Sequence, residues 1–205
     1  MPVRTTIHGS EDTLFITFTC FQWLPLIELT NGYDLVYKWF DYLKSQRHLV
    51  TGYVVMPNHV HALIYFSKTD KPINKIIGNG KRFMAYEMVK RLKETRQNEM
   101  VARLQNAVEA KDRQRGKKHE VWENSFDSKI CRNEKYINQK LAYMHANPCT
   151  GKWKLAKTPI DYEHSSARFY ITSRHAAYEV TNVDEILKII LNNSAETTAN
   201  AQGNE

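Results

Sequence analysis

Two apolar segments, residues 49–56 and 59–66, constrain the fold more than any other feature of the sequence. Both have the length of β-strands, and both are rich in Val, Tyr and other residues that favour strands. Only Pro57 and Asn58 separate them, and this dipeptide is typical of a turn. When the connection between two strands is this short, the strands can pair only in the antiparallel direction. The sequence therefore predicts a β-hairpin.

Further strands and helices are predicted on both sides of this hairpin. Residues 14–21 interleave Thr with aromatic and aliphatic side chains, which is the pattern of a half-buried strand. A helix is predicted from Glu134 to Asn147, because Pro148 disfavours helical geometry in the residue before it. The other predicted elements are helices over residues 33–46 and 71–115 and short strand fragments at 121–122 and 128–131.

The composition indicates one globular domain. The chain has 205 residues, of which 42% are hydrophobic and 25% charged, enough to bury a sizeable core. We predict a single domain over residues 1–192 that includes a basic helical insertion around 97–118, followed by a disordered polar tail at 193–205. Near residue 182 a last helix begins, and its apolar residues Ile186, Leu187 and Ile190 either cover the chain's own core or form a homodimer interface.

The expected location of the chain is the cytoplasm. No run of about 18 uncharged apolar residues is present, so we expect no membrane span, and the N-terminus lacks the apolar run of a signal peptide. The three cysteines, Cys20, Cys131 and Cys149, are far apart and form no CxxC pair. A reducing compartment therefore suits this chain better than an oxidising one.

Basic residues are concentrated in one segment. Residues 81–119 hold 12 Lys and Arg against 5 Asp and Glu, an excess equal to the net charge of +7 of the whole chain. Such a segment favours binding to a polyanion such as a nucleic acid, although a solvated helix face explains it nearly as well. The candidate phosphate contacts are Lys81, Arg82, Lys90, Arg91 and Lys93.

The sequence His59-Val60-His61 begins the second strand of the hairpin. Side chains alternate along a strand, so both imidazoles project from one face while Val60 points into a core on the other. Two imidazoles in this relation can share a metal ion, or they can simply lie on a solvated sheet face. A zinc site that adds Cys131 and Cys149 is a weaker alternative, because no two cysteines have the expected close spacing.

Tyr143 and Asn147 lie four residues apart on the predicted helix from Glu134, so they share one helical face. Tyr136 and Lys140 continue this stripe. An adjacent apolar stripe, formed by Ile137, Leu141 and Met144, should pack on the sheet. Taken alone, the tyrosine is an ordinary packing residue and the asparagine before proline an ordinary helix stop.

Two longer strings resemble the HUH single-tyrosine transposases, and most of all the branch of REP-associated tyrosine transposases. They are Tyr53-Val54-Val55-Met56-Pro57-Asn58-His59-Val60-His61-Ala62-Leu63-Ile64 and Tyr143-Met144-His145-Ala146-Asn147-Pro148. Residues 121–127 and 162–167 are weaker echoes of the same family, and the order of all four matches it. The resemblance covers roughly residues 13–170.

This resemblance implies an α+β fold in which helices flank a central antiparallel sheet, the ferredoxin-like or RRM-like fold of HUH endonucleases. It also implies cleavage and rejoining of single-stranded or hairpin DNA. Tyr143 would be the nucleophile that forms a 5′-phosphotyrosine, and His59, His61 and Asn147 would hold Mg²⁺ or Mn²⁺. Two imidazoles and an amide oxygen would by ligand preference suit a first-row transition metal better than magnesium.

Two other functions remain open from the sequence. One is a DNA-binding protein that keeps the fold without catalysis, and the other is a metal-dependent hydrolase that uses water while Tyr143 is a bystander. Only the transposase interpretation predicts a covalent protein–DNA adduct. The charged stretch 97–118 is longer than compact members of the family need, so it is either an added DNA-contacting arm or a spacer.

Overall fold

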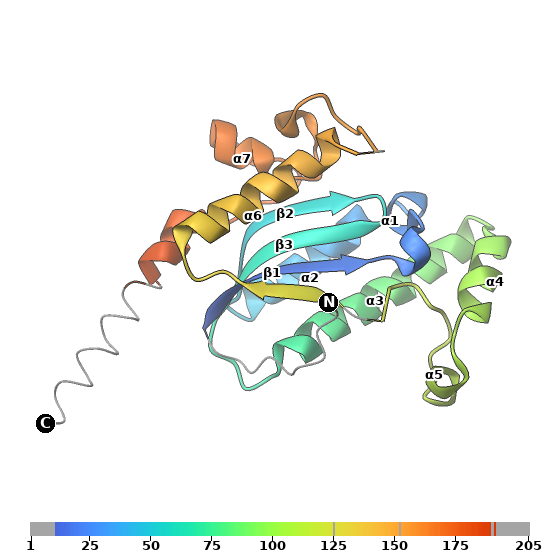
Figure 1. Cartoon of the computed structure of the whole chain (residues 1–205). Helices are drawn as coiled ribbons and strands as arrows, with labels where there is room; N and C mark the ends of the chain where they lie inside the picture. The colour runs from blue at the N-terminus through green and yellow to red at the C-terminus, as the bar shows by residue number, and fades with distance from the viewer. Residues whose placement is uncertain (1–10, 125, 152, 190, 192–205) are drawn as a thin grey trace, which may run out of the picture.

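The computed structural model describes residues 11–124, 126–151, 153–189 and 191. Four antiparallel strands form one sheet in the order β2-β3-β1-β4, with helices on both sides (Figure 1). The elements in chain order are β1 (Asp12–Thr19), η1 (Phe21–Trp23), α1 (Leu26–Leu29), α2 (Tyr33–Ser45), β2 (Leu49–Met56), β3 (His59–Phe66), α3 (Ile73–Glu94), α4 (Asn98–Asn106), α5 (Ala110–Gln114), β4 (Asp127–Ile130), α6 (Glu134–Ala146), η2 (Asn147–Cys149), η3 (Pro159–Asp161) and α7 (Ala167–Thr172). The predicted α+β class with a central antiparallel sheet is confirmed.

The predicted hairpin is present with the predicted bounds, as β2 and β3. All eight residues of β3 are buried, because this strand lies inside the sheet between β2 and β1 and helices cover both of its faces. The register sets His61 opposite Thr17 of β1 and His59 opposite Thr19. The first strand begins at Asp12 and ends at Thr19, two residues earlier at each end than predicted, and the short 3-10 helix η1 follows it.

The larger hydrophobic core lies on the sheet face that α2 and α3 cover. Val60 and Ile64 of β3 point into it, as the alternation along the strand predicts. Phe40 of α2 and Ile77 of α3 are fully buried against this face. Helices α2 and α3 therefore cover the face of the sheet opposite to the one that carries the histidines.

A smaller core lies on the other face, beneath α6 (Figure 1). The predicted apolar stripe of α6, formed by Ile137, Leu141 and Met144, packs here against Phe15 and Leu63 of the sheet. Because this stripe packs on the sheet, the adjoining face of α6 lies toward the end of the sheet where β3 begins. The helix thus presents Tyr143 to the two histidines.

The segment predicted to be helical over 71–115 forms three separate helices, α3, α4 and α5. The chain leaves α3 after Glu94, and Arg96 adopts a left-handed backbone with φ of 58° before α4 begins at Asn98. No Gly or Pro marks this break, so the sequence pattern did not indicate it. Helices α4 and α5 lie at one end of α3 (Figure 1).

The helix predicted near residue 182 begins at residue 183, includes residues 183–189 and 191 of the described part of the chain, and packs on its own chain. Ile186 is fully buried, and Leu187 packs against the smaller core together with Val183. The first of the two alternatives, covering the chain's own core, therefore describes these residues. Ile190 and the predicted disordered tail at 193–205 lie outside the described residues. No described helix has the length and apolar character needed to cross a bilayer.

Gly80 allows α3 to lie close to α2. A Cβ atom at this position would overlap the indole of Trp39, which is buried in the larger core. We expect Gly80→Ala to lower the free energy of unfolding by about 1–3 kcal/mol, because overpacking forces the two helices apart. A Cβ atom at Gly78 of the same helix would meet no other atom within 4 Å, so Gly78→Ala is a matched control that should raise stability by about 0.5–1 kcal/mol. Urea unfolding measures both, and equal effects of the two variants would contradict this packing argument.

Candidate active site

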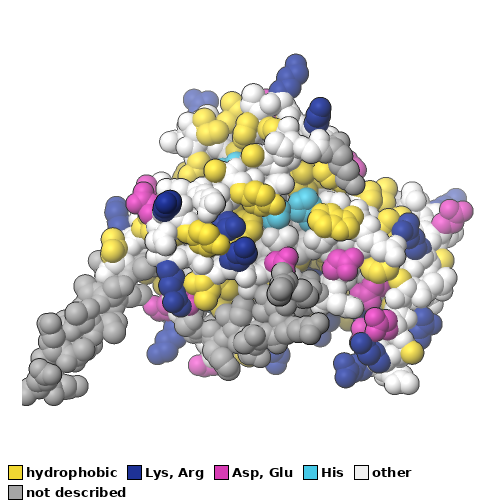
Figure 2. Space-filling view, viewed as in Figure 1, with side chains coloured by type: hydrophobic (Ala, Val, Ile, Leu, Met, Phe, Trp, Pro, Cys, Tyr) yellow, Lys and Arg dark blue, Asp and Glu magenta, His cyan; other side chains and the backbone are white. Residues whose placement is uncertain are grey.

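His59 and His61 lie side by side on the sheet face beneath α6. Their ring centroids are 4.8 Å apart, and the two side chains are only 7% and 5% exposed. The alternative of two histidines on a solvated sheet face is therefore wrong. Both residues line a cleft of about 610 Å³ between the sheet and the end of α6. Histidine surface is visible between hydrophobic side chains on this face of the molecule (Figure 2).

Asn58 fixes the proton on His59. Its side-chain Nδ2 donates to the backbone carbonyl of Trp23 at 3.0 Å, so its Oδ1 is the atom that lies 2.7 Å from Nδ1 of His59. An amide oxygen only accepts hydrogen bonds, so Nδ1 of His59 carries the proton and Nε2 keeps its lone pair. Outer-shell partners of this kind orient histidine ligands of metals. From the sequence, only a role in the turn is expected for Asn58.

Thr17 plays the corresponding part for His61. Its hydroxyl lies 2.7 Å from Nδ1 of His61, and the strand register places the two residues opposite each other. When the hydroxyl accepts this hydrogen bond, Nε2 of His61 is also free to bind a ligand. Burial lowers the pKa of His59 to about 4. The pKa of His61 falls to about 3, mainly because the side chain is buried and to a smaller extent because His59 and Lys140 lie nearby. Both imidazoles are therefore neutral at pH 7.

Tyr143 and Asn147 reach the same cleft from the C-terminal end of α6. The Tyr143 ring is 53% exposed, and its centroid lies 5.4 Å from that of His61. Asn147 directly follows the helix, which ends at Ala146, one residue before the predicted end. The Asn147 Nδ2 atom donates to the backbone carbonyl of Tyr143 at 3.2 Å, which leaves its Oδ1 atom available to a ligand. The structure thus brings together all four residues that the two sequence strings singled out.

Lys140 is a further cation in this cleft. Its Nζ atom lies 5.1 Å from the ring centroid of Phe15 and 6.0 Å from that of Tyr143. Helical spacing alone predicts that Lys140 lies on the stripe of Tyr143, but it does not indicate a function for this lysine. The signal was present in the spacing of three residues, which places both side chains on one helical face.

Comparison with protein-family models and with curated proteins gave no match. Among solved structures, one described as a REP-associated tyrosine transposase bound to a REP hairpin superimposes on the chain with a TM-score of 0.54. The sequences are 18% identical, and the match covers 89% of this chain and 93% of that chain. This chain has the fold of a REP-associated tyrosine transposase. The fold that the sequence resemblance implied is thereby confirmed.

The cleft holds two imidazoles and one side-chain amide, a donor set that would suit a metal ion. Nε2 of His59 and His61 would bind from the sheet and Oδ1 of Asn147 from the end of α6, and the open cleft leaves room for phosphate oxygens and water. Among the described residues, no group of three or more His, Cys, Asp or Glu side chains could hold a metal ion. Cys131 and Cys149 do not line the cleft, so the zinc alternative built on them is wrong.

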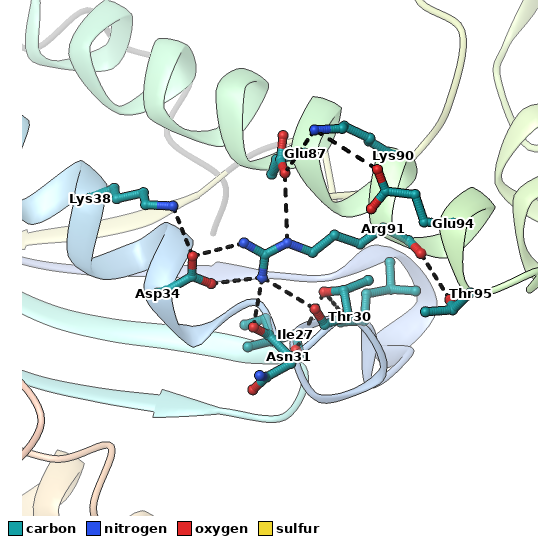
Figure 3. A network of polar contacts seen from close by, with 11 residues as sticks. Ile27, Thr30, Asn31, Asp34, Lys38, Glu87, Lys90, Arg91, Glu94 and Thr95 are labelled. Atoms are coloured by element: carbon teal, nitrogen blue, oxygen red, sulfur yellow. Dashed lines mark hydrogen bonds and ion pairs between the residues drawn. The ribbon is translucent and has the colours of Figure 1, made fainter.

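Arg91 and Lys81, two of the five predicted phosphate contacts, donate hydrogen bonds to other parts of the chain. Arg91 forms a bidentate ion pair with Asp34 at 2.7 and 2.8 Å and also donates to the carbonyl of Asn31 (Figure 3). This contact with Arg91 is the main reason that the pKa of Asp34 falls to about 2. Arg91 thus holds α3 to the beginning of α2. Lys81 is 9% exposed, and its Nζ atom donates to the carbonyl of Glu123 at 2.8 Å.

The other three predicted contacts, Arg82, Lys90 and Lys93, have exposed side chains. They line a groove between α3 and residues 115–124. Lys90 also lies 3.7 and 3.9 Å from the carboxylates of Glu87 and Glu94 (Figure 3). Contact of these cations with phosphate stays a prediction.

Proposed function

We propose that this protein is a metal-dependent enzyme that cleaves and rejoins single-stranded DNA at hairpins or palindromic repeats through a 5′-phosphotyrosine intermediate. The observation that carries the proposal is the position of the Tyr143 ring, 5.4 Å from His61, in a cleft where both histidines have their Nδ1 atoms occupied by protein partners. The solved structure with the same fold is described as a REP-associated tyrosine transposase bound to a REP hairpin, which supports DNA as the substrate.

In the proposed reaction the phenolic oxygen of Tyr143 attacks the scissile phosphorus. The new bond joins this oxygen to phosphorus, the bond from phosphorus to the 3′ oxygen breaks, and the phenolic proton is lost while the departing 3′ oxygen gains one. Rejoining is the reverse attack by a 3′-hydroxyl, so the energy of the phosphodiester is kept. Mg²⁺ or Mn²⁺, when bound, offsets negative charge on the non-bridging oxygens.

The protein's own side chains orient these groups. Neutral His59 and His61 would bind a ligand through Nε2, and the amide of Asn147 is tied to the helix end by its bond to the carbonyl of Tyr143. Lys140 adds a positive charge on the Tyr143 side of the cleft, where the phosphate of the strand would lie. A free phenol has a pKa near 10, so it is a weak nucleophile at pH 7. The surrounding cationic charge compensates for this weakness because it stabilises the negative charge that develops on the phosphate.

A gel assay tests the proposal. The protein is incubated with labelled hairpin DNA from the sequence flanking its gene and with Mn²⁺ or Mg²⁺, then run under denaturing conditions. We expect a DNA-linked protein band that disappears with EDTA. Cleavage without such a band would indicate a hydrolase, and binding without cleavage across several flanking hairpins and both metals would indicate a DNA-binding protein.

The contact of Asn58 with His59 gives a separate prediction. Asn58→Ala removes the acceptor that fixes the His59 proton, so we expect the Mn²⁺ concentration for half-saturation to rise about 10- to 100-fold. Asn58→Asp keeps an acceptor for Nδ1 and should retain Mn²⁺ affinity, although its carboxylate faces the Trp23 carbonyl and lowers stability. Titration calorimetry with Mn²⁺ measures affinity, and thermal unfolding reports folding. Equal Mn²⁺ affinity in Asn58→Ala and the wild type would contradict this role.

A further inference from the structure

Trp23 is an exposed aromatic side chain in the cleft. It is 58% exposed, whereas Trp39 and Trp122 are buried in the larger core. Its ring centroid lies 5.7 Å from that of His59, and the two planes meet at 69°. A large apolar ring left open to solvent beside the two histidines has no role in the packing of either core. It is therefore available to a ligand that binds at the histidines.

The backbone that carries Trp23 is held in an unfavourable conformation. Gln22 and Trp23 are consecutive non-glycine residues in the left-handed region, with φ of 49° and 58°. Such a conformation persists only where surrounding contacts impose it, and it is concentrated at functional sites. Here the conformation turns the indole out of the core and toward the cleft.

Three side chains from other elements hold this loop in place. Asn58 donates to the carbonyl of Trp23 at 3.0 Å, and the carboxylate of Glu123 accepts from the backbone N–H of Gln22 at 2.8 Å. The guanidinium of Arg103 in α4 donates to the side-chain oxygen of Gln22 at 2.6 Å. The basic insertion around 97–118 thus supports the loop directly, through Arg103.

We propose that Trp23 forms a stacking subsite for one unpaired nucleobase of the strand held in the cleft. This inference rests on the proposed function, which supplies single-stranded DNA as the ligand. A phosphate bound at His59 would lie close enough to Trp23, whose ring centroid is 5.7 Å from that of His59, for the base of an adjoining nucleotide to reach the indole. An unpaired base presents a π-face that stacks on any aromatic ring. The insertion is a positioning element for this subsite through Arg103 and Gln22.

The test couples a protein variant to a DNA change. In a Tyr143→Phe background, which prevents cleavage, Trp23→Ala should weaken binding of a hairpin with a single-stranded flank by about tenfold or more. The same flank is then scanned with one abasic site at a time. At one position in the flank, the abasic site should weaken DNA binding by Tyr143→Phe about tenfold or more. The same abasic site should change DNA binding by the Trp23→Ala/Tyr143→Phe double variant by less than about twofold. Trp23→Phe should retain most of the affinity, because it keeps an aromatic face.

The outcomes distinguish the stacking subsite, DNA as the ligand and the role of the insertion. Additive losses at every position would mean that Trp23→Ala disturbs the loop without touching a base, and would overturn the subsite. Unchanged affinity in Trp23→Ala would overturn it as well. Failure of the Tyr143→Phe protein to bind any flanking hairpin would overturn the subsite together with DNA as the ligand, whereas the adduct assay alone decides the phosphotyrosine chemistry. Arg103→Ala should reduce the loss of affinity that the abasic site causes at the same position. If this loss is unchanged in Arg103→Ala, the insertion does not position Trp23.

Discussion

Tyr143→Phe is expected to form no covalent DNA adduct and to cleave DNA at least about 10⁴-fold more slowly than the wild type. The substitution removes only the phenolic oxygen, while the ring can keep its contacts with His61 and Phe15. Folding and DNA binding should therefore be unchanged. Single-turnover cleavage of labelled hairpin DNA, followed on denaturing gels, measures the effect.

Tyr136→Phe is the matched control for this variant. Tyr136 lies two turns earlier on α6 and does not line the cleft, so its loss should leave the adduct and the rate unchanged. An adduct that persists in Tyr143→Phe would refute the assignment of the nucleophile. Cleavage that persists at full rate without an adduct would instead favour hydrolysis by water.

His61→Ala is expected to lower the cleavage rate about 10³-fold, because it removes a buried, neutral ligand from the proposed metal site. Treatment of the wild type with EDTA should produce a comparable loss. Added Mn²⁺ should restore the treated wild type but not His61→Ala. Cleavage rates over a range of Mn²⁺ concentrations, with circular dichroism to verify folding, check both expectations.

His175→Ala is a suitable control, because His175 lies outside the cleft and stacks on Phe169. It should retain the wild-type response to Mn²⁺. Full activity of the wild type in EDTA would contradict metal dependence. A His61→Ala protein that regains its rate at high Mn²⁺ would show that His61 only strengthens metal binding.

Local patterns predicted the hairpin and much of α6. Strand composition and the turn at Pro57 and Asn58 define β2 and β3, whose bounds agree with the prediction. The apolar stripe of α6 meets the sheet as its periodicity indicated. The break at Arg96 could not be predicted in this way, because a single left-handed residue without Gly or Pro leaves no mark on helical periodicity.

The candidate site was predictable only in part. The sequence strings named His59, His61, Tyr143 and Asn147, which line one cleft. The partners of the imidazoles were not predictable, because Thr17 meets His61 only through the register between β1 and β3, and Asn58 is oriented by a loop without periodicity. A run of basic residues likewise could not show that Arg91 is paired with Asp34.

The ion pair between Arg91 and Asp34 affects the electrostatic attraction between the protein and an approaching polyanion. Arg91 and Asp34 together carry no net charge, and their atoms are only 2.7 Å apart. From beyond a Debye length, which is about 8 Å at physiological salt, the pair contributes little to the field. Electrostatic steering of a nucleic acid then depends on the exposed cations at the groove beside α3, including Arg82 and Lys93. The formal charge of +7 describes the composition of the chain, whereas the arrival rate of a polyanion depends on where those exposed cations lie.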